Sequence, residues 1–330
     1  MSYANKEVIL QVEDLCKRYG SVTAVDGISF AIYRGEVLGF LGPNGAGKST
    51  TIDLITTLQQ PDDGYITYPG LSGASQPHAV RQHIGIVPQE LAIYGNLSVR
   101  DNLFYIGRMY GLRSQELKLR IDALLAEFDL ADKAAARART LSGGQKRRLN
   151  FALANIHNPS LVLLDEPTVG LDPNARMLVW QIIQGFRQAG KTVLLTTHYM
   201  EEAETLCERI ILIDRGRIVA QGTPAELKSD LSDELVLEYQ LAGLVPQQLV
   251  EGLRQQPGVR QALSDGTTLR VVVGRSQVEA IKAWLAGAGL AVSGMRTADI
   301  SLEDVFVHFT GRRLGEEDKA AMEAKSPGLA

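Results

Sequence analysis

The sequence predicts an α/β fold with a mostly parallel sheet, followed by a smaller α+β part. One observation is an apolar strand that runs into a glycine-rich loop near residue 42, and another is the alternation of helix and strand patterns over 144–214. Strands separated by helices of this length are typical of βαβ units, whose strands pair in parallel. After residues 227–233 the pattern changes to short strands and helices, which indicates a second domain.

The individual elements follow from the spacing of apolar residues. In the first domain, strands are expected at 8–12, 28–32, 36–41, 161–164, 192–197 and 209–214, and helices at about 51–58, 144–157, 174–188 and 199–206. Helical spacing between 99 and 130 indicates a helical insert. In the second domain, strands are expected at 235–241, 269–273 and 290–295, and helices at 247–255, 277–286 and 302–309.

These elements give a domain plan. We expect a first domain over 1–231, an α+β appendage over 235–310, and a tail over 311–330 that frays in solvent because it mixes charges with Ala, Pro and Gly.

The composition excludes some classes of protein. The chain has 330 residues, 45% of them hydrophobic, and its 34 basic and 38 acidic side chains give a net charge of −4. This argues against a chain that mainly holds nucleic acid, which needs a basic footprint. The three basic residues Lys146, Arg147 and Arg148 are interpreted as a solvated face of a helix.

The sequence also bears on location. Cys16 and Cys207 form no CxxC pair and are interpreted as reduced thiols of a cytoplasmic protein. The amino terminus lacks the basic start and long apolar stretch of a secretory signal. Apolar runs such as Leu161–Leu164 are far shorter than the about 20 residues that span a bilayer. We expect that this chain does not cross a membrane by itself.

The glycine-rich loop is the strongest chemical motif. Residues Gly42–Ser49 fit the pattern G-x-x-x-x-G-K-[ST] between an expected strand and an expected helix, the context this phosphate-binding motif requires. Its backbone N–H groups and the helix N-terminus attract phosphate. Lys48 is expected to contact the β- and γ-phosphates, and the Ser49 hydroxyl to hold Mg²⁺.

Two acidic residues follow the expected strand 161–164. Such a strand delivers Asp165 and Glu166 to the carboxyl edge of the sheet, where ligands bind in open α/β folds. Asp165 can hold Mg²⁺ directly or through water, and Glu166 can orient or deprotonate an attacking water. Acids after a strand are more often an ordinary loop start, but the phosphate loop upstream reverses that interpretation.

Two weaker motifs complete the set. The turn Ser142-Gly143-Gly144 opens an expected helix and offers an anion N–H groups and a hydroxyl, although in isolation it is more simply an N-cap. His198 follows the strand 192–197. A lone histidine there is usually structural, yet at the carboxyl end of a core strand it can reach a γ-phosphate.

In order and spacing these motifs resemble the ATPase subunits of ATP-binding cassette (ABC) transporters over about residues 6–230. The resemblance implies a P-loop NTPase cassette with a RecA-like core, an antiparallel β part and a helical subdomain at about 98–140 that docks on transmembrane subunits. It also implies that ATP and Mg²⁺ are cofactors. The active form would be a head-to-tail homodimer, with two ATPs between the phosphate loop of one subunit and the signature loop of the other.

The resemblance also gives each matching position a role. Tyr19 matches the aromatic residue that stacks on adenine, Glu166 the general base, and His198 the switch histidine that senses the γ-phosphate. Gln89 matches the Q-loop glutamine, which links metal, water and the membrane partner. The implied ATP contacts, besides Tyr19, are Gly42, Pro43, Asn44, Gly45, Ala46, Gly47, Lys48, Ser49 and Thr50 in the phosphate loop, Ser142, Gly143, Gly144 and Gln145 in the signature, and Asp172 in the D-loop. The implied metal positions are Ser49, Gln89 and Asp165.

The amino-acid sequences of the phosphate loop, of residues 168–173 and of residues 301–306 resemble those of the drug- and antibiotic-exporter branch. That branch includes the daunorubicin/doxorubicin-resistance and nodulation ATPases, whose permeases are separate chains. It implies an ATP-hydrolysing subunit that powers export of a drug, antibiotic or lipid-like compound from the cytoplasmic face of the membrane. Gln145 is a departure, since many members have methionine there.

Two other classes stay open. Non-transport ABC ATPases act on ribosomes or DNA, but they carry paired cassettes with basic linkers, a long coiled coil or zinc cysteines, and this acidic chain shows one cassette. An importer ATPase is the other alternative, with a regulatory domain that resembles 235–330. An adjacent gene for a chain with about six apolar 20-residue segments would support export, and one for a periplasmic binding protein would support import.

Overall fold

The computed structural model describes residues 6–70, 77–288 and 291–312. The chain divides into two compact units, Met1–Gln221 and Gly222–Ala330. The division lies before helix α8 (Pro224–Ser229) and so before the expected end of the first domain at residue 231, because α8 packs against α11 (Leu302–Thr310) of the second unit. The expected tail lies outside the described residues from position 313 onward.

A three-stranded antiparallel sheet opens the first unit. Strand β1 (Val8–Tyr19) lies between β2 (Val22–Tyr33) and β4 (Asp63–Thr67) and pairs antiparallel with both. Strands β1 and β2 extend further than the sequence predicted, because residues 18–23 at the end of their hairpin are exposed. The hairpin places Tyr19 beside the turn between the two strands.

The six-stranded sheet carries the site. Its order is β5 (Ile84–Val87), β6 (Leu161–Asp165), β7 (Thr192–Thr197), β3 (Val37–Leu41), β8 (Arg209–Asp214) and β9 (Arg217–Gly222). The first five strands pair in parallel, which is the mostly parallel sheet that the sequence predicted, although β5 was not among the expected strands. Parallel strands end at the same edge, so the glycine-rich loop, Gln89, Glu166 and His198, which follow β3, β5, β6 and β7, all emerge there.

The core of the first unit lies between these two sheets and includes helix α1 (Lys48–Ile55). It joins Leu10 and Phe30 of the antiparallel sheet, Phe40 and Leu163 of the parallel sheet and Ile52 of α1, all nearly inaccessible to solvent. Helices α6 (Pro173–Gln188) and α7 (Met200–Leu206) pack on β7, and α2 (Pro77–His83) on β5. Burial on both faces explains why the central strands read as continuous apolar runs.

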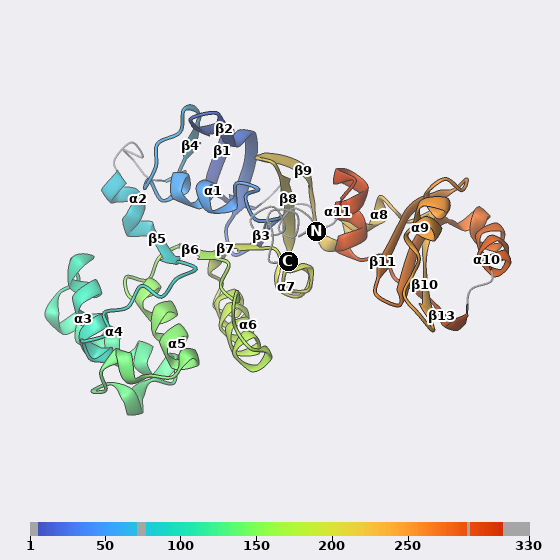
Figure 1. The fold of residues 1–330 in the computed structure, drawn as a ribbon. Coiled ribbons are helices and arrows are strands. Elements are labelled where there is room, and N and C mark those ends of the chain that lie inside the picture. Colours follow the sequence, from blue (N-terminus) through green and yellow to red (C-terminus); the bar gives the residue numbers. More distant parts are fainter. Residues whose placement is uncertain (1–5, 71–76, 289–290, 313–330) are drawn as a thin grey trace. The chain divides into compact units, whose positions relative to one another are not determined.

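The expected helical insert is present between β5 and β6. Helices α3 (Val99–Met109) and α4 (Ser114–Glu127) pack together, and α3 also contacts α5 (Gly143–Ala154). Figure 1 shows the three helices side by side, away from the antiparallel sheet. Short 3₁₀ turns at Ala131–Lys133 and Ala138–Thr140 connect α4 to α5. No helix in the described ranges is long and apolar enough to span a membrane.

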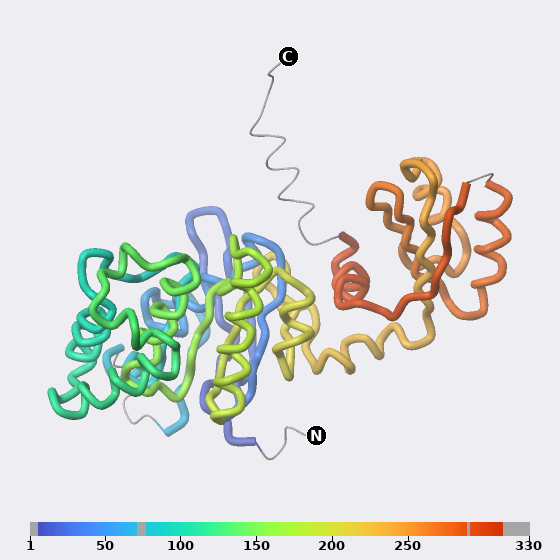
Figure 2. The backbone as a smooth tube through the Cα atoms, turned by 90° about the horizontal axis from the view of Figure 1, so that it is seen from below, coloured from blue at the N-terminus to red at the C-terminus, as the bar shows by residue number. Residues whose placement is uncertain are grey.

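The second unit folds as a βαββαβ unit, which Figure 2 follows as a tube coloured from yellow to red. Its elements are β10 (Glu234–Leu241), α9 (Gln247–Arg254), β11 (Val259–Asp265), β12 (Thr268–Gly274), α10 (Val278–Gly287) and β13 (Val292–Ala298). The antiparallel sheet has the order β11-β12-β10-β13, and α9 and α10 share its core. Strand β11 was not among the expected strands, although the turn Asp265-Gly266 after it is a hairpin signal.

Candidate functional site

A cavity of about 560 Å³ lies at the carboxyl edge of the parallel sheet. Its walls come from the β1–β2 hairpin, the glycine-rich loop and the ends of three strands. The lining residues are Tyr19, Val22, Ala24, Asn44, Gly45, Gly47, Lys48, Ser49, Thr50, Gln89, Glu166, Val169 and His198. The structure therefore brings together the Q-loop, general-base and switch-histidine candidates with most of the phosphate loop.

The phosphate loop needs glycine where the backbone comes close to its neighbours. Gly47 has φ +103°, and a Cβ there would lie 2.3 Å from the carbonyl oxygen of Ala24. A Cβ on Gly42 would lie 2.2 Å from the carbonyl oxygen of Ile213. Gly47 precedes α1, and among the described residues no side chain caps that helix. The first N–H groups of any helix have no intrahelical partner, and no capping side chain in the described ranges occupies those of α1. This end of α1 therefore suits an anion such as phosphate.

Lys48 is buried at the first position of α1. Its Nζ donates to the carbonyl oxygens of Gly42 (2.8 Å) and Pro43 (3.0 Å), so the loop wraps around its own lysine. Nζ also lies 3.0 Å from Oε1 of Glu166, and the Lys48 side chain is 4% exposed. A phosphate in the cavity would gain the Lys48 ammonium by drawing it from Glu166.

Glu166 directly follows β6 in a left-handed backbone conformation, with φ +44°. Its N–H lies within hydrogen-bond distance of the carbonyl oxygen (3.1 Å) and hydroxyl (3.0 Å) of Thr196, which holds this unfavourable conformation. His198 Nδ1 lies 3.3 Å from Oε2. Burial raises the pKa of Glu166, but His198 and the Lys48 ammonium outweigh burial and lower that pKa to about 2. The carboxylate is therefore charged at neutral pH.

Oxygen atoms suited to Mg²⁺ meet next to the cavity. The Ser49 hydroxyl donates to Oδ1 of Asp165 at 3.1 Å, and the Thr196 hydroxyl donates to the same oxygen at 2.6 Å. Mg²⁺ prefers oxygen ligands and usually combines one or two protein groups with phosphate oxygens and water. Ser49 and Asp165 therefore fit the metal positions that the sequence suggested.

The signature residues do not line this cavity. Ser142 caps α5 in a capping box: the N–H of Gln145 donates to the Ser142 hydroxyl (3.3 Å), and the N–H of Ser142 donates to Oε1 of Gln145 (3.0 Å). A methionine at 145 would lack that amide acceptor. Asp172 likewise caps α6 by accepting from the N–H of Ala175 at 3.0 Å. Within one chain, then, the N-cap interpretation of Ser142 is correct.

Sequence reasoning was wrong about one basic residue. Arg147 is only 5% exposed, whereas Lys146 and Arg148 are half-buried. The guanidinium donates to three carbonyl oxygens, those of Pro88, Gln89 and Pro167. A usable signal was the i,i+4 spacing of Arg147 to the buried Phe151, which puts both on the inner face of α5.

Comparisons with known proteins agree with this geometry. A family model described as "ABC transporter" matches residues 25–169. The linearmycin resistance ATP-binding protein LnrL of Bacillus subtilis (strain 168) is 38% identical over 310 residues, which is 93% of this chain and 99% of that protein. Nod factor export ATP-binding protein I of Ralstonia nicotianae is 46% identical over 219 residues, covering 66% of this chain and 68% of that protein.

Solved structures give the same result. The fold matches cbiO1 from Clostridium perfringens, part of the ABC transporter complex cbiONQ, with a TM-score of 0.62 and 29% identity over 68% of this chain and 92% of that one. It also matches an ATP-binding subunit of an ABC transporter with a TM-score of 0.61 and 31% identity over 68% of this chain and 93% of that one. The chain is thus an ATP-binding ATPase of the ABC transporter family, in the branch of drug-resistance and nodulation-factor exporter ATPases.

Proposed function

We propose that this chain hydrolyses Mg²⁺-bound ATP to power a separate membrane permease, which exports a drug, antibiotic or lipid-like compound. The observation that carries the proposal is the cavity in which Lys48, Glu166 and His198 meet the phosphate loop. Export is supported by the names of the relatives, one of which aligns with 93% of this chain. The chain would work at the cytoplasmic face of the membrane, bound to its permease.

Each part of the cavity has a task in this proposal. The free N–H groups of α1 and the Lys48 ammonium hold the phosphates. Ser49, Asp165 and Gln89 would hold Mg²⁺, which when bound neutralises phosphate charge. Glu166 takes a proton from the attacking water, and His198 contacts the γ-phosphate from the neighbouring strand end.

The Lys48–Glu166 pair links binding to catalysis. While the lysine pairs with the carboxylate, Glu166 is a weak base because an adjacent positive charge lowers its pKa. Phosphates compete for that ammonium, and its shift toward them removes one cause of the low pKa. Phosphate binding would therefore release the Glu166 carboxylate from its ion pair with Lys48.

The partners follow from exposed parts of the first unit. The Ser142 turn faces solvent and does not serve the cavity of its own chain, so we assign it to the ATP held by a second copy. On the helical insert, α3 exposes the apolar side chains of Phe104, Tyr105 and Met109. An exposed apolar cluster of this kind suits a protein partner, and we assign it to the permease.

Co-purification tests the transport proposal. The chain is expressed with and without a candidate permease, a chain with about six apolar 20-residue segments, and the membrane fraction is solubilised in detergent. We expect the chain in the membrane fraction only with that permease, and ATP hydrolysis by the isolated complex. A stable complex with an importer and its periplasmic binding protein would contradict export, and a ribosome-bound chain would contradict transport.

Tyr19 is expected to supply ring surface to adenine. Tyr19 is 46% exposed and lies on the cavity wall, and a base–aromatic stack is worth about 1–3 kcal/mol. Tyr19→Ala should weaken ATP binding roughly 5- to 150-fold, whereas Tyr19→Phe should stay within about twofold of wild type. Titration calorimetry measures both, with Tyr65→Ala on β4 as a control outside the cavity. Equal losses in the two Tyr19 variants would reject stacking.

The nucleotide cavity should not need the second unit. All its lining residues precede Gln221, and the two units have separate hydrophobic cores. A chain ending at Gln221 should bind ATP within about twofold of the full chain. A chain ending at Leu231 keeps α8 without α11, which exposes Leu227 and Leu231, and should aggregate more in light scattering. An insoluble shorter chain would show that the units depend on each other.

A further inference from the structure

The buried Arg147 makes three contacts that the catalytic scheme above does not use. Nη1 donates to the carbonyl oxygens of Pro88 (3.3 Å) and Gln89 (3.2 Å), and Nη2 donates to that of Pro167 (2.5 Å). The side chain lies outside the lining of the nucleotide cavity. Arg147 therefore acts on the backbone of neighbouring segments.

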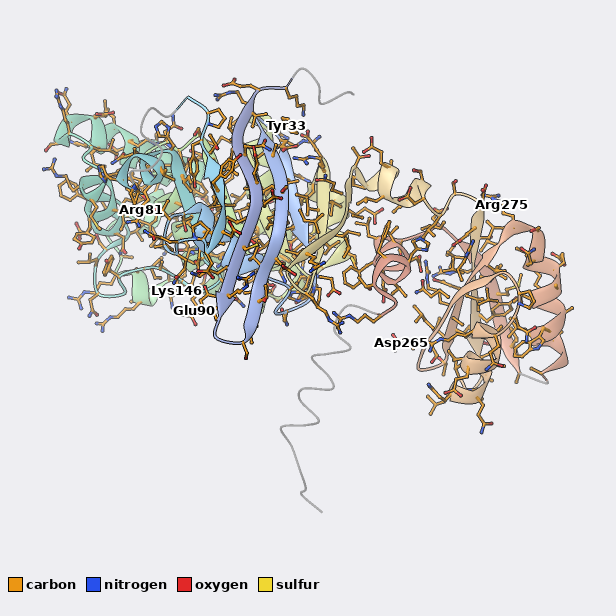
Figure 3. The ribbon with its side chains drawn as sticks, turned by 90° about the horizontal axis from the view of Figure 1, so that it is seen from above. Tyr33, Arg81, Glu90, Lys146, Asp265 and Arg275 are labelled. Carbon is orange, nitrogen blue, oxygen red and sulfur yellow. The ribbon has the colours of Figure 1, made fainter. Side chains whose placement is uncertain are left out.

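Those segments are parts of the proposed catalytic site. Pro88 and Gln89 follow β5, and Pro167 comes directly after Glu166 at the end of β6, the strand that pairs with β5. Arg147 itself stands one turn into α5, whose N-cap is Ser142. Figure 3 labels Lys146 and Glu90, the chain neighbours of Arg147 and Gln89. One guanidinium thus joins the signature helix to the loops that carry Gln89 and Glu166.

Arginine suits this position better than other residues. The hydrogen-bond partners of Arg147 are neutral carbonyl oxygens. Hydrogen bonds from a charged donor are stronger than those from a neutral one, and they offset the cost of burying the guanidinium. The planar guanidinium reaches two sides at once, toward Pro88 and Gln89 with one nitrogen and toward Pro167 with the other. A lysine ammonium is a single point of charge and cannot span the same separation.

We propose that Arg147 is a positioning residue for ATP hydrolysis: it holds the Gln89 loop and the Glu166 segment in register with the signature helix. The proposal rests on the proposed function, because it deepens the roles given there to Gln89 and Glu166. It predicts that ATP binding and ATP hydrolysis respond differently to the loss of Arg147. Binding depends on the phosphate loop and Tyr19, which Arg147 does not touch, whereas hydrolysis depends on the groups that it positions.

The test is steady-state ATP hydrolysis by the full chain. Arg147→Met keeps the length but removes the hydrogen bonds, and should lower kcat about 10- to 100-fold with KM within about threefold, since small misplacements of catalytic groups cost that much. Arg147→Lys keeps the charge and can contact either Pro88 and Gln89 or Pro167, but not both sides. Its kcat should lie between those of the wild type and of Arg147→Met. Arg148→Met is the matched control. Arg148 is adjacent on the same helix, but it donates to Phe128 and Asp129, so its removal should leave kcat within about twofold.

Three outcomes would overturn the proposal: an unchanged kcat in Arg147→Met, an equal loss in Arg148→Met, or a rise in KM as large as the loss in kcat. Thermal melts verify that each variant is folded. If Arg147→Met does not fold, Arg147→Lys decides, and a wild-type kcat in that variant overturns the proposal. Glu166→Gln separates the two levels. If it is inactive while Arg147→Met is fully active, only the positioning role of Arg147 fails; if it hydrolyses ATP normally, the role proposed for Glu166 fails first. The absence of ATP hydrolysis by the wild-type chain would contradict the proposed function itself.

Discussion

Glu166→Gln should bind ATP and almost stop hydrolysing it. Glutamine keeps the size and hydrogen-bonding capacity of the side chain but cannot accept the proton of the attacking water. A general base contributes about 10²- to 10⁴-fold to the rate, so kcat should fall by at least about 100-fold. The same variant should accumulate as a dimer with ATP and Mg²⁺, because the closed state is no longer resolved by hydrolysis.

The ion pair at this site adds a second expectation. In the wild type, Lys48 lies 3.0 Å from Glu166, and phosphates must compete with that carboxylate. Removing the carboxylate charge frees the ammonium for phosphate and removes a negative charge beside it. The ATP dissociation constant of Glu166→Gln should therefore be lower than that of the wild type, by roughly threefold or more.

Hydrolysis under single-turnover conditions, equilibrium ATP binding and light scattering with and without ATP and Mg²⁺ measure these three quantities. Glu201→Gln is the matched control, since Glu201 is an exposed acid at the start of α7 outside the cavity. A normal rate in Glu166→Gln, or its failure to dimerise where wild type does, would refute the assignment of the base and of the interface. Weaker ATP binding would refute the competition between Glu166 and phosphate for Lys48.

The sequence was informative about Lys48, Glu166 and His198 because each follows a buried parallel strand. Apolar runs at 36–41, 161–164 and 192–197 marked the strands, and the sheet then placed Lys48, Glu166 and His198 at one edge. What it could not predict are contacts set by side-chain packing. The Lys48–Glu166 pair joins residues far apart in the chain, and no local pattern encodes it.

The prediction of a solvated Arg147 and the failure to predict strand β11 have the same origin. A run of basic residues usually marks a solvated face, but α5 turns by about 100° per residue, so Arg147 points inward while its neighbours are half-buried. The polar strand β11 escaped notice because it lies at a sheet edge and shows little alternation. Local averaging fails where a polar residue has a specific buried partner or where an edge strand is partly exposed.

Mixed dimers provide the sharpest test of the two-subunit site. Ser142 is exposed, lies at the start of α5 and does not line its own cavity. If it serves the ATP of a second copy, Ser142→Arg should block closure by its bulk and charge, yet leave ATP binding by the single chain within about twofold, because the loss of an N-cap costs only about 1 kcal/mol. Lys48→Ala, by contrast, disables the phosphate loop of its own chain.

The pairing decides which composite site survives. In a mixed dimer of Lys48→Ala with Ser142→Arg, both lesions fall on one composite site and the other stays whole. The same holds for Glu166→Gln with Ser142→Arg. Both mixtures should therefore hydrolyse more ATP than either parent alone. With random pairing, about half of the dimers in a 1:1 mixture are mixed. Lys48→Ala mixed with Glu166→Gln is the control, since each composite site then carries one lesion and no activity should return.

The readout is the rate of phosphate release over a range of mixing ratios at constant total protein. If the subunits complement each other, the rate of phosphate release reaches a maximum at intermediate ratios in the two Ser142→Arg mixtures. In the control mixture the rate stays low at every ratio. No maximum in either Ser142→Arg mixture, while Ser142→Arg still binds ATP, would mean that Ser142 does not act across a dimer interface. A maximum in the control mixture would mean that Lys48 and Glu166 serve different ATP molecules, in conflict with the 3.0 Å that separates their side chains within one chain.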